Sequence, residues 1–305
     1  MNILVIDNGL GPFVDEQIKS ISSIDKSVKI TRYSFSGKNN KLNYVKAIID
    51  INKILSKNKY DLIHAHYGLT GFISLFQNKC PVICTFHGSD VLYVKWQNIL
   101  SRFVSKYCAA SIAVSSEIAN KLNSKNVFII PCGVDDNLFY PTSKTSLKNR
   151  LGLDNSKIYI LFPSSPNRKV KNYKLFKQVF ERLKKEYDIE QLLLENLSRQ
   201  EVRDYLNVSN LVLLTSFSES TNTTIKEALF CNTPVISVNV GDHMEILSKF
   251  NRNFITSYNV DDIVKSVKWL LNNNNIWDFR REMKYYKIDN IANIILGIYK
   301  KLYNN

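Results

Sequence analysis

Residues 215–247 read TSFSESTNTTIKEALFCNTPVISVNVGDHMEIL. In this stretch an apolar strand ends in a turn rich in Ser, Thr and Asn, and the turn leads directly into a helix. The first residues of a helix have backbone N–H groups without intrahelical partners, and these groups bind anions. The stretch therefore predicts a strand-turn-helix unit that receives a phosphate at residues 221–224.

The same alternation of short apolar runs and longer mixed segments extends over the whole chain, which indicates parallel sheets of an α/β fold. A chain of 305 residues is long enough for two domains. We expect two doubly wound, Rossmann-like halves that face each other across a cleft, because open α/β sheets bind ligands beyond the carboxyl ends of their strands. The polar segment 142–155 is expected to lead into the linker. In the first half we expect strands at 2–7, 28–35, 61–67, 81–87, 111–116 and 127–133.

The chain is basic, with 41 Lys and Arg against 27 Asp and Glu. No stripe of basic and aromatic residues on a known module indicates a nucleic-acid partner, so we expect none. Residues 19–59 hold ten basic and two acidic side chains, and residues 93–107 read YVKWQNILSRFVSKY. These segments resemble an interfacial surface and predict an anionic membrane as partner. Two alternatives stay open: the aromatic residues of 93–107 pack a core helix, or the lysines reflect compositional drift.

The five cysteines lie among apolar neighbours, and their odd number argues against a disulfide framework. No run of apolar residues is long enough to span a membrane. We therefore expect a cytoplasmic chain, peripheral on the inner face of the membrane if the basic surface binds there. No Cys or His spacing is typical of a metal site, so no metal is expected.

Two further features could bind a phosphorylated ligand. The basic loop FPSSPNRKVKNY at 162–173 carries Arg168 and Lys171, which could stabilise charge on a departing phosphate. Glu219 and Glu227 bracket the start of the helix in the opening stretch, and a carboxylate suits a ribose diol. The alternatives are an exposed basic loop and two ordinary acids near a helix N-terminus.

Histidines and glycines follow the predicted strands of the first half. HAHYG at 64–68 contains His66, and TFHGSD at 85–90 contains His87 and Asp90. These side chains are expected to form hydrogen bonds to a ligand, because no metal-binding spacing accompanies them. The loop GLGP at 9–12 has glycines that permit close backbone approach, but it lacks the third glycine of a dinucleotide fingerprint.

Together these motifs resemble the signature of the retaining, GT-B-type glycosyltransferases of family 4. The resemblance rests on E-x7-E from Glu219 to Glu227, then EAL, PVISVNVGD and a final Glu245. The glycine loop, HAHYG, FHGSD, IPCGVD at 130–135 and the basic loop ending in KN agree in order and spacing. The resemblance covers almost the whole chain.

The resemblance implies an enzyme that transfers a sugar from a UDP- or GDP-sugar to a glycan or lipid-linked acceptor, as in bacterial cell-envelope polysaccharide synthesis. It implies an acceptor-side domain at 1–150, a nucleotide-sugar domain at 151–280, and a C-terminal helix at 281–305 that packs back on the first domain. The resemblance implies that retention needs no enzymic nucleophile, because the departing phosphate takes the acceptor proton, and no cofactor. It also implies no divalent metal, because Arg168 and Lys171 would neutralise the leaving diphosphate.

The resemblance also implies roles for single residues. Around the reacting centre, His87 would lie beneath the donor sugar, Glu219 would contact its hydroxyls, and Arg168 and Lys171 would neutralise the leaving diphosphate. Acceptor-side candidates are His66 and Asp90. The donor would be bound by a further group: Gly9, Gly11, Ser220, Asn222, Thr223, Thr224 and Glu227.

Three departures from the family pattern support an alternative. Ser220 stands where the family has Gly, Ser165-Pro166 replaces a Gly-Arg pair, and the segment 188–210 is shorter than in larger relatives. The alternative is a non-catalytic GT-B-fold binding subunit of a glycosyltransferase complex.

Overall fold

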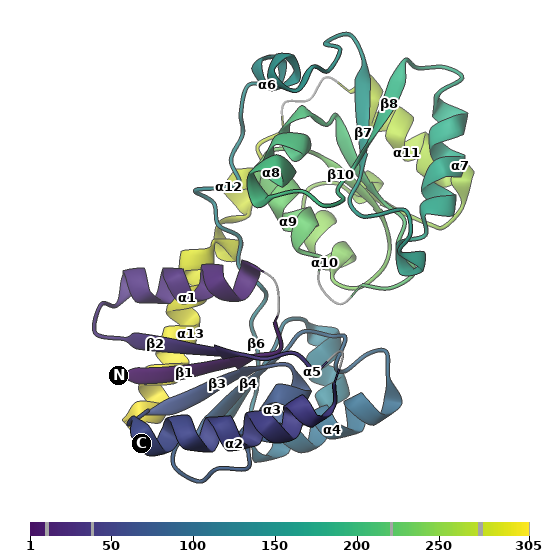
Figure 1. The fold of residues 1–305 in the computed structure, drawn as a ribbon. Helices are drawn as coiled ribbons and strands as arrows, with labels where there is room; N and C mark the ends of the chain where they lie inside the picture. Colours follow the sequence, from purple (N-terminus) through teal and green to yellow (C-terminus); the bar gives the residue numbers. More distant parts are fainter. Residues whose placement is uncertain (10–11, 38–39, 220–221, 274–276, 305) are drawn as a thin grey trace. The chain divides into compact units, whose positions relative to one another are not determined.

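The computed structural model describes residues 1–9, 12–37, 40–219, 222–273 and 277–304. The chain forms two compact units, each an α/β domain with one parallel sheet (Figure 1). The first unit comprises Met1–Gly133 with Ile288–Asn305, and the second comprises Val134–Lys287. The division therefore falls at 133/134, not at the expected 150/151.

The first unit has a six-stranded sheet in the order β2-β1-β3-β4-β5-β6, with every neighbouring pair parallel. Four of the strands, β1, β3, β4 and β5, are almost fully buried, as expected for strands covered on both faces, whereas the edge strands β2 and β6 are partly exposed. The strands are β1 (Asn2–Asp7), β2 (Lys29–Ser34), β3 (Leu62–His66), β4 (Val82–Phe86), β5 (Ala110–Ala113) and β6 (Val127–Ile129).

Helices cover both faces of this sheet, because alternate strand residues point to opposite sides. Ile3 and Val5 pack against α1 (Pro12–Ile24) and α13 (Ile288–Tyr303). Leu4 and Ile6 belong to the core on the other face, which also includes residues of four helices. That second face carries α2 (Leu42–Lys57), α3 (Gly68–Ser74), α4 (Lys95–Tyr107) and α5 (Ser116–Leu122).

The second unit has a five-stranded parallel sheet in the order β11-β10-β9-β7-β8. One continuous core lies around it. Its strands are β7 (Ile158–Phe162), β8 (Ile189–Leu193), β9 (Leu211–Leu214), β10 (Val235–Val238) and β11 (Ile255–Thr256). Its helices are α6 (Lys144–Leu151), α7 (Tyr173–Leu183), α8 (Arg199–Val208), α9 (Thr223–Phe230), α10 (His243–Leu247), α11 (Val260–Asn272) and α12 (Phe279–Glu282).

The structure corrects two expectations from the sequence. The polar segment 142–155, expected to lead into a linker, lies within the second unit and contains α6, which Ser143 caps at its N-terminus and which ends before Gly152 in the left-handed region. The expected C-terminal helix at 281–305 is not one helix, because α12 ends at Glu282 and α13 starts at Ile288. Among the described residues, no helix has the length and apolar character needed to cross a bilayer.

Candidate functional site

In the second unit, the loops that follow β7 and β9 are joined by hydrogen bonds. The Phe217 N–H donates to the Val170 carbonyl at 2.9 Å, and the Thr215 hydroxyl lies 3.1 Å from the Lys171 carbonyl and 3.0 Å from the Asn172 carbonyl. Both strands end at the same edge of the sheet because they are parallel. The basic loop and the opening turn of the Glu219 segment therefore form one structure.

Lys171 and Glu219 form an ion pair at this junction. Both side chains are about nine-tenths buried, with 10% and 11% of their surfaces exposed. The same oxygen of Glu219 also accepts from the Ser216 hydroxyl at 2.7 Å and from the Asn222 amide at 3.3 Å. The cation expected to meet the diphosphate and the carboxylate expected to meet the sugar thus neutralise each other here.

The helix α9 begins next to this pair. Asn222 caps the helix, and its side-chain oxygen accepts from the Thr224 N–H at 3.0 Å. Thr223 and Thr224 are half-buried. The cap already occupies one of the N–H groups expected to receive a diphosphate, so such a ligand has to displace the cap or bind a neighbouring N–H.

Glu227 lies in the second turn of α9 and is buried. Its Oε1 accepts from Arg199 Nη1 at 2.9 Å, and the Glu227 side chain is 3% exposed. Arg199 comes from the first turn of α8, and its guanidinium also lies over the Phe139 ring at 4.7 Å. The sequence gives no signal for this partner, because α8 and α9 are separated by a strand.

The loop between β10 and α10 completes the second-unit site. Gly241 has φ +57°, and a Cβ there would come within 2.7 Å of the Glu219 carbonyl oxygen. Behind it, Lys226 is fully buried, with Nζ 3.6 Å from Asp242 Oδ2. His243 is also fully buried, its Nδ1 lies 2.6 Å from the Ser237 hydroxyl, and burial lowers its pKa. Sequence reasoning missed Lys226, although a lysine inside the apolar run of α9 was a signal.

Four predicted residues do not join this group. The Arg168 side chain is exposed and has no hydrogen-bonding or ionic partner among the described residues. Ser220 and Gly11 lie outside the described residues. Gly9 belongs to the first unit, where its φ is +79° and its N–H donates to Asp7 Oδ1 at 2.8 Å.

Asp7 anchors the glycine loop at the end of β1 and was not predicted. Burial raises its pKa, but hydrogen bonds from Arg32, Ser34 and Gly9 outweigh burial, so the pKa lies below its usual value. Arg32 Nε donates to Asp7 Oδ2 at 2.6 Å and the Ser34 hydroxyl donates to Oδ1 at 2.6 Å. The loop therefore starts from a fixed, charged residue.

The ends of β3 and β4 bring His66 and His87 together, with His66 Nδ1 3.1 Å from His87 Nε2. The rings of Phe13 and Tyr67 lie 4.9 Å and 4.8 Å from the His87 ring. Burial, assisted by a neighbouring histidine, lowers the pKa of each histidine to about 3. Both are therefore neutral near pH 7, and His66 Nε2 is buried with no hydrogen-bond partner among the described residues.

Asp90, in the loop that follows β4, accepts hydrogen bonds from the residues that follow both β3 and β4. Its carboxylate accepts from the N–H groups of Gly68 at 2.8 Å, Gly88 at 2.9 Å and His87 at 3.2 Å. Burial raises the pKa of Asp90 to about 6. Asp90 also lines a cavity of about 260 Å³, together with Asn8, Tyr44, Tyr67, Leu69, Ser89, Gln97, Leu100 and Ser101.

The structure therefore places the predicted residues in two groups, one in each unit. Lys171, Glu219 and the start of α9 form the first, and His66, His87 and Asp90 form the second. Within the described ranges, no three His, Cys, Asp or Glu side chains are arranged to hold a metal ion.

Models of known families match both halves of the chain. The family model described as Glycosyltransferase Family 4 matches residues 4–138, and the model described as Glycosyl transferases group 1 matches residues 186–289. The chain is 24% identical over 240 residues to N-acetyl-alpha-D-glucosaminyl L-malate synthase of Bacillus anthracis. That match covers 67% of this chain and 63% of the relative, so the chain spans less than two thirds of the relative's length.

Solved structures share the fold over the whole chain. Sucrose-phosphate synthase from Thermosynechococcus elongatus has a TM-score of 0.81 at 14% identity, with 100% of this chain and 99% of that chain covered. Anabaena Alr3699/HepE in complex with UDP and glucose has a TM-score of 0.78 at 15% identity, with 99% and 100% covered. Family models over both halves of the chain, the motifs of both units and this fold show that the chain belongs to family 4 of the GT-B glycosyltransferases.

Proposed function

We propose that the chain transfers a sugar, with retention of configuration, from a UDP- or GDP-sugar to a glycan or lipid-linked acceptor. The observation that carries this proposal is the buried pair of Lys171 and Glu219 beside the N-terminus of α9. A cation and helix N–H groups suit a diphosphate, and a carboxylate suits sugar hydroxyls. Anabaena HepE, which shares the fold, has been solved with UDP and glucose, in support of a nucleotide-sugar donor.

Before the donor binds, Lys171 and Glu219 neutralise each other. On binding, Lys171 turns from Glu219 to the diphosphate, and the freed Glu219 oxygen accepts from a sugar hydroxyl. The bond between the anomeric carbon and the phosphate oxygen then breaks while the acceptor oxygen bonds to the same face. The acceptor proton passes to the departing phosphate oxygen, and the acceptor attacks directly, so we propose that no enzymic nucleophile takes part. Lys171 neutralises charge on the diphosphate, so we propose that no divalent metal is required.

The first unit would supply the acceptor side. His87 is neutral because its pKa is about 3, so it can exchange hydrogen bonds with hydroxyls but carries no charge near pH 7. Asp90 lines the cavity of about 260 Å³, which is large enough for part of a glycan. We propose that this reaction serves cell-envelope polysaccharide synthesis, in the cytoplasm at the inner face of the membrane.

Calorimetry with UDP and GDP in the presence of a chelator tests the donor site. We expect saturable binding of one nucleotide, weakened about ten- to a hundredfold in Lys171→Ala, because a charged hydrogen bond contributes ~1.5–3 kcal/mol. Lys177→Ala is the matched control, since Lys177 is an exposed lysine of the adjacent helix α7. Absence of nucleotide binding, or equal affinity in both variants, would overturn the proposed donor site.

Turnover separates an enzyme from a binding subunit. Release of free sugar from the bound nucleotide sugar, lost in Glu219→Gln, is the result expected of a transferase. Nucleotide binding without turnover of a panel of UDP- and GDP-sugars would instead favour the non-catalytic subunit.

A further inference from the structure

The helix α4 of the first unit exposes a row of large apolar side chains. Trp96, Ile99, Phe103 and Tyr107 are 56%, 60%, 46% and 59% exposed. Their spacing of three and four residues puts them along one side of the helix, while Val104 and its neighbours face the core. The core-packing alternative is therefore wrong for Phe103 and Tyr107.

The row continues on to α2, where Leu42, Val45 and Ile49 are 71%, 57% and 63% exposed. Phe76, in the segment that follows α3, is also 53% exposed. Figure 1 shows α2, α3 and α4 on the same side of the sheet. We call the exposed side of α2, Phe76 and α4 the apolar face.

Contacts within the first unit join the parts of this face. The Phe72 ring lies 5.2 Å from the Phe76 ring and 6.2 Å from the Phe103 ring. From α2, the Asn52 amide donates to the Phe76 carbonyl at 3.4 Å. Phe76 and α4 are thus joined through Phe72, and Phe76 also contacts α2 through Asn52. Several large apolar side chains exposed on one side of a domain indicate an interaction site.

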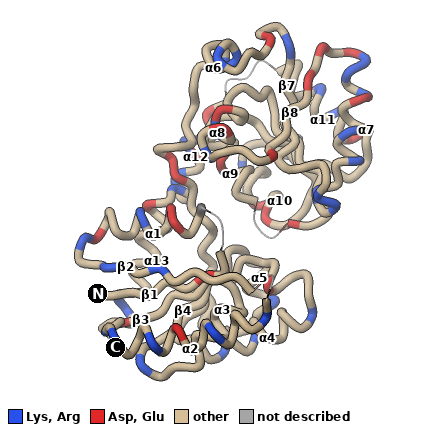
Figure 2. The backbone as a smooth tube through the Cα atoms, in the orientation of Figure 1, with Lys and Arg blue, Asp and Glu red and all other residues tan. Residues whose placement is uncertain are grey.

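Cations surround the apolar side chains, and carboxylates are nearly absent. The sequence of α4 contains Lys95, Arg102 and Lys106 but no acid, and all three cations are exposed. The sequence of α2 has one acid, Asp50, which accepts from the Tyr33 hydroxyl at 3.0 Å. Figure 2 shows basic residues along α2 and α4.

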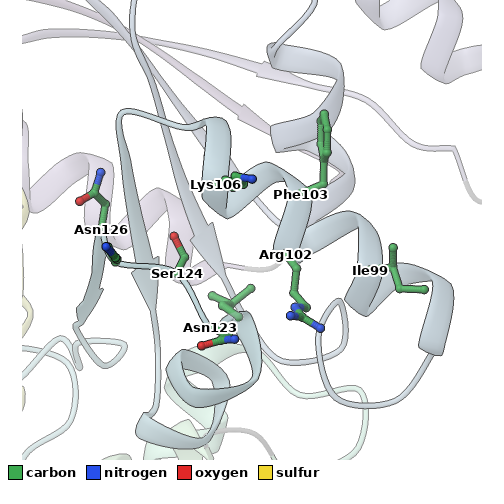
Figure 3. Close-up of a pocket in the computed structure, with 9 residues that line it drawn as sticks. Ile99, Arg102, Phe103, Lys106, Asn123, Ser124 and Asn126 are labelled. Carbon is green, nitrogen blue, oxygen red and sulfur yellow. The ribbon is translucent and has the colours of Figure 1, made fainter.

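A cavity of about 620 Å³ opens beside α4, between this helix and the segment that follows α5 (Figure 3). Arg102 and Lys106 line it from α4, and Lys125 lines it from the segment before β6. Ile99 and Phe103 of the apolar face also line the cavity. Three cations beside an apolar rim match a phosphate headgroup whose acyl chains lie against the rim.

We propose that the apolar face docks on a bilayer of anionic phospholipid, with a lipid phosphate in the cavity at Arg102 and Lys106. A second copy of the chain fits the face poorly, because two such faces would oppose lysines to lysines without carboxylates between them. A bilayer satisfies both features, since it offers anionic headgroups and an apolar interior. The binding requires neither nucleotide nor turnover, so it stands apart from the proposed transfer reaction.

Vesicle sedimentation tests the proposal on the full chain without nucleotide. The vesicles contain phosphatidylcholine alone or phosphatidylcholine with about 30% phosphatidylglycerol, an anionic lipid that attracts basic side chains. We expect binding to the anionic vesicles that weakens as salt rises. Arg102→Ser with Lys106→Ser should weaken it about thirtyfold, given the usual contribution of each cation near a membrane. The matched control is Lys184→Ser with Lys185→Ser, two exposed lysines of the second unit.

Insertion of the apolar row is measured separately. Trp96 is the tryptophan on the face, and Trp269 and Trp277 lie in the second unit. Anionic vesicles should shift the tryptophan emission to shorter wavelength in the wild type and leave it unshifted in Trp96→Phe. Ile99→Ser with Phe103→Ser should retain the wild-type circular dichroism and lose vesicle binding.

Three results would overturn the proposal. The first is no binding to anionic vesicles at low salt. The second is equal binding by the α4 variants and the control. The third is a dimer in sedimentation velocity that Ile99→Ser with Phe103→Ser dissociates, because the face would then bind a second copy.

Discussion

The buried carboxylates of the second unit each have a cationic partner, but the partners are not equally exposed. Glu219 and Lys171 are nearly equally buried. The Glu227 side chain is 3% exposed, whereas the Arg199 side chain is 28% exposed. Loss of the arginine therefore leaves a buried carboxylate without its cation, while loss of the carboxylate leaves a cation that can turn to water.

Arg199→Ala should lower the free energy of unfolding by about 3 kcal/mol, because an unpaired buried charge costs that order of energy. Arg182→Ala is the control, since Arg182 and Asp261 form an exposed pair, with 56% and 69% of their side chains exposed. We expect that control to cost less than about 1 kcal/mol. Urea unfolding measures both, and equal losses would contradict the assigned burial of Glu227.

The histidine pair predicts acid sensitivity. His66 and His87 have pKa values near 3 in the fold, below the usual 6.5, so the unfolded chain binds more protons between those values. Keeping both histidines neutral therefore costs no stability above pH 6.5. As pH falls below 6.5, the free energy of unfolding decreases by about 1.4 kcal/mol per pH unit for each histidine. The double variant His66→Asn, His87→Asn should flatten the decline in stability between pH 7 and 5, measured by urea unfolding.

Asp90 acts in the opposite direction over part of this range. Its pKa is raised from 3.8 to about 6, so the fold holds the proton more tightly than the unfolded chain does. Stability from this group therefore grows as pH falls from 6 towards 4. In Asp90→Asn the decline in stability below pH 6 should be steeper than in the wild type, and an unchanged slope would contradict the raised pKa.

At the scale of elements, the sequence predicted strands better than short helices. Most strands are apolar runs that a parallel sheet buries on both faces, and nearly all appear where expected. The helix α3 was missed because its sequence, GLTGFIS, contains two glycines, which disfavour a helix. Close packing explains why these two positions are glycines. A Cβ at Gly68 would lie 2.0 Å from the Ser101 hydroxyl oxygen, and a Cβ at Gly71 would lie 2.7 Å from the Cys84 Sγ.

The helix α6 was missed for a different reason. Its sequence, KTSLKNRL, has no apolar stripe, so periodicity could not reveal it. Ser143 before it and Gly152 after it are the start and stop signals that periodicity alone overlooks. In the candidate site, motifs predicted Lys171 and Glu219, but pairings between distant segments, such as Arg199 with Glu227, leave no trace in a single sequence.

The docking of α13 depends on a buried hydrogen bond. Tyr299 is fully buried, and its hydroxyl lies 2.5 Å from His64 Nδ1 in β3. Tyr299→Phe leaves that nitrogen without its partner and should lower the free energy of unfolding by about 1–3 kcal/mol. Tyr303→Phe, at a tyrosine of the same helix that is 56% exposed, should be neutral. Urea unfolding distinguishes the two.

At the scale of the whole molecule, each unit has its own hydrophobic core. We therefore expect two calorimetric transitions. Tyr299→Phe should lower the temperature of the first unit's transition, and Arg199→Ala should lower the temperature of the second unit's transition. A nucleotide sugar at a hundred times its dissociation constant should add ~2.7 kcal/mol to the transition that Arg199→Ala lowers. A single transition that responds to every change would contradict independent cores.

The first unit is discontinuous in sequence, because α13 completes the face that α1 only partly covers. A ribosome makes the chain from its N-terminus and domains fold as units, so residues 134–287 emerge in full before α13 does. The second unit can thus reach its native state while the first still exposes Ile3, Val5 and the buried His64. The unit whose synthesis starts first is the last to finish folding, and during that interval it is the part that a chaperone would bind.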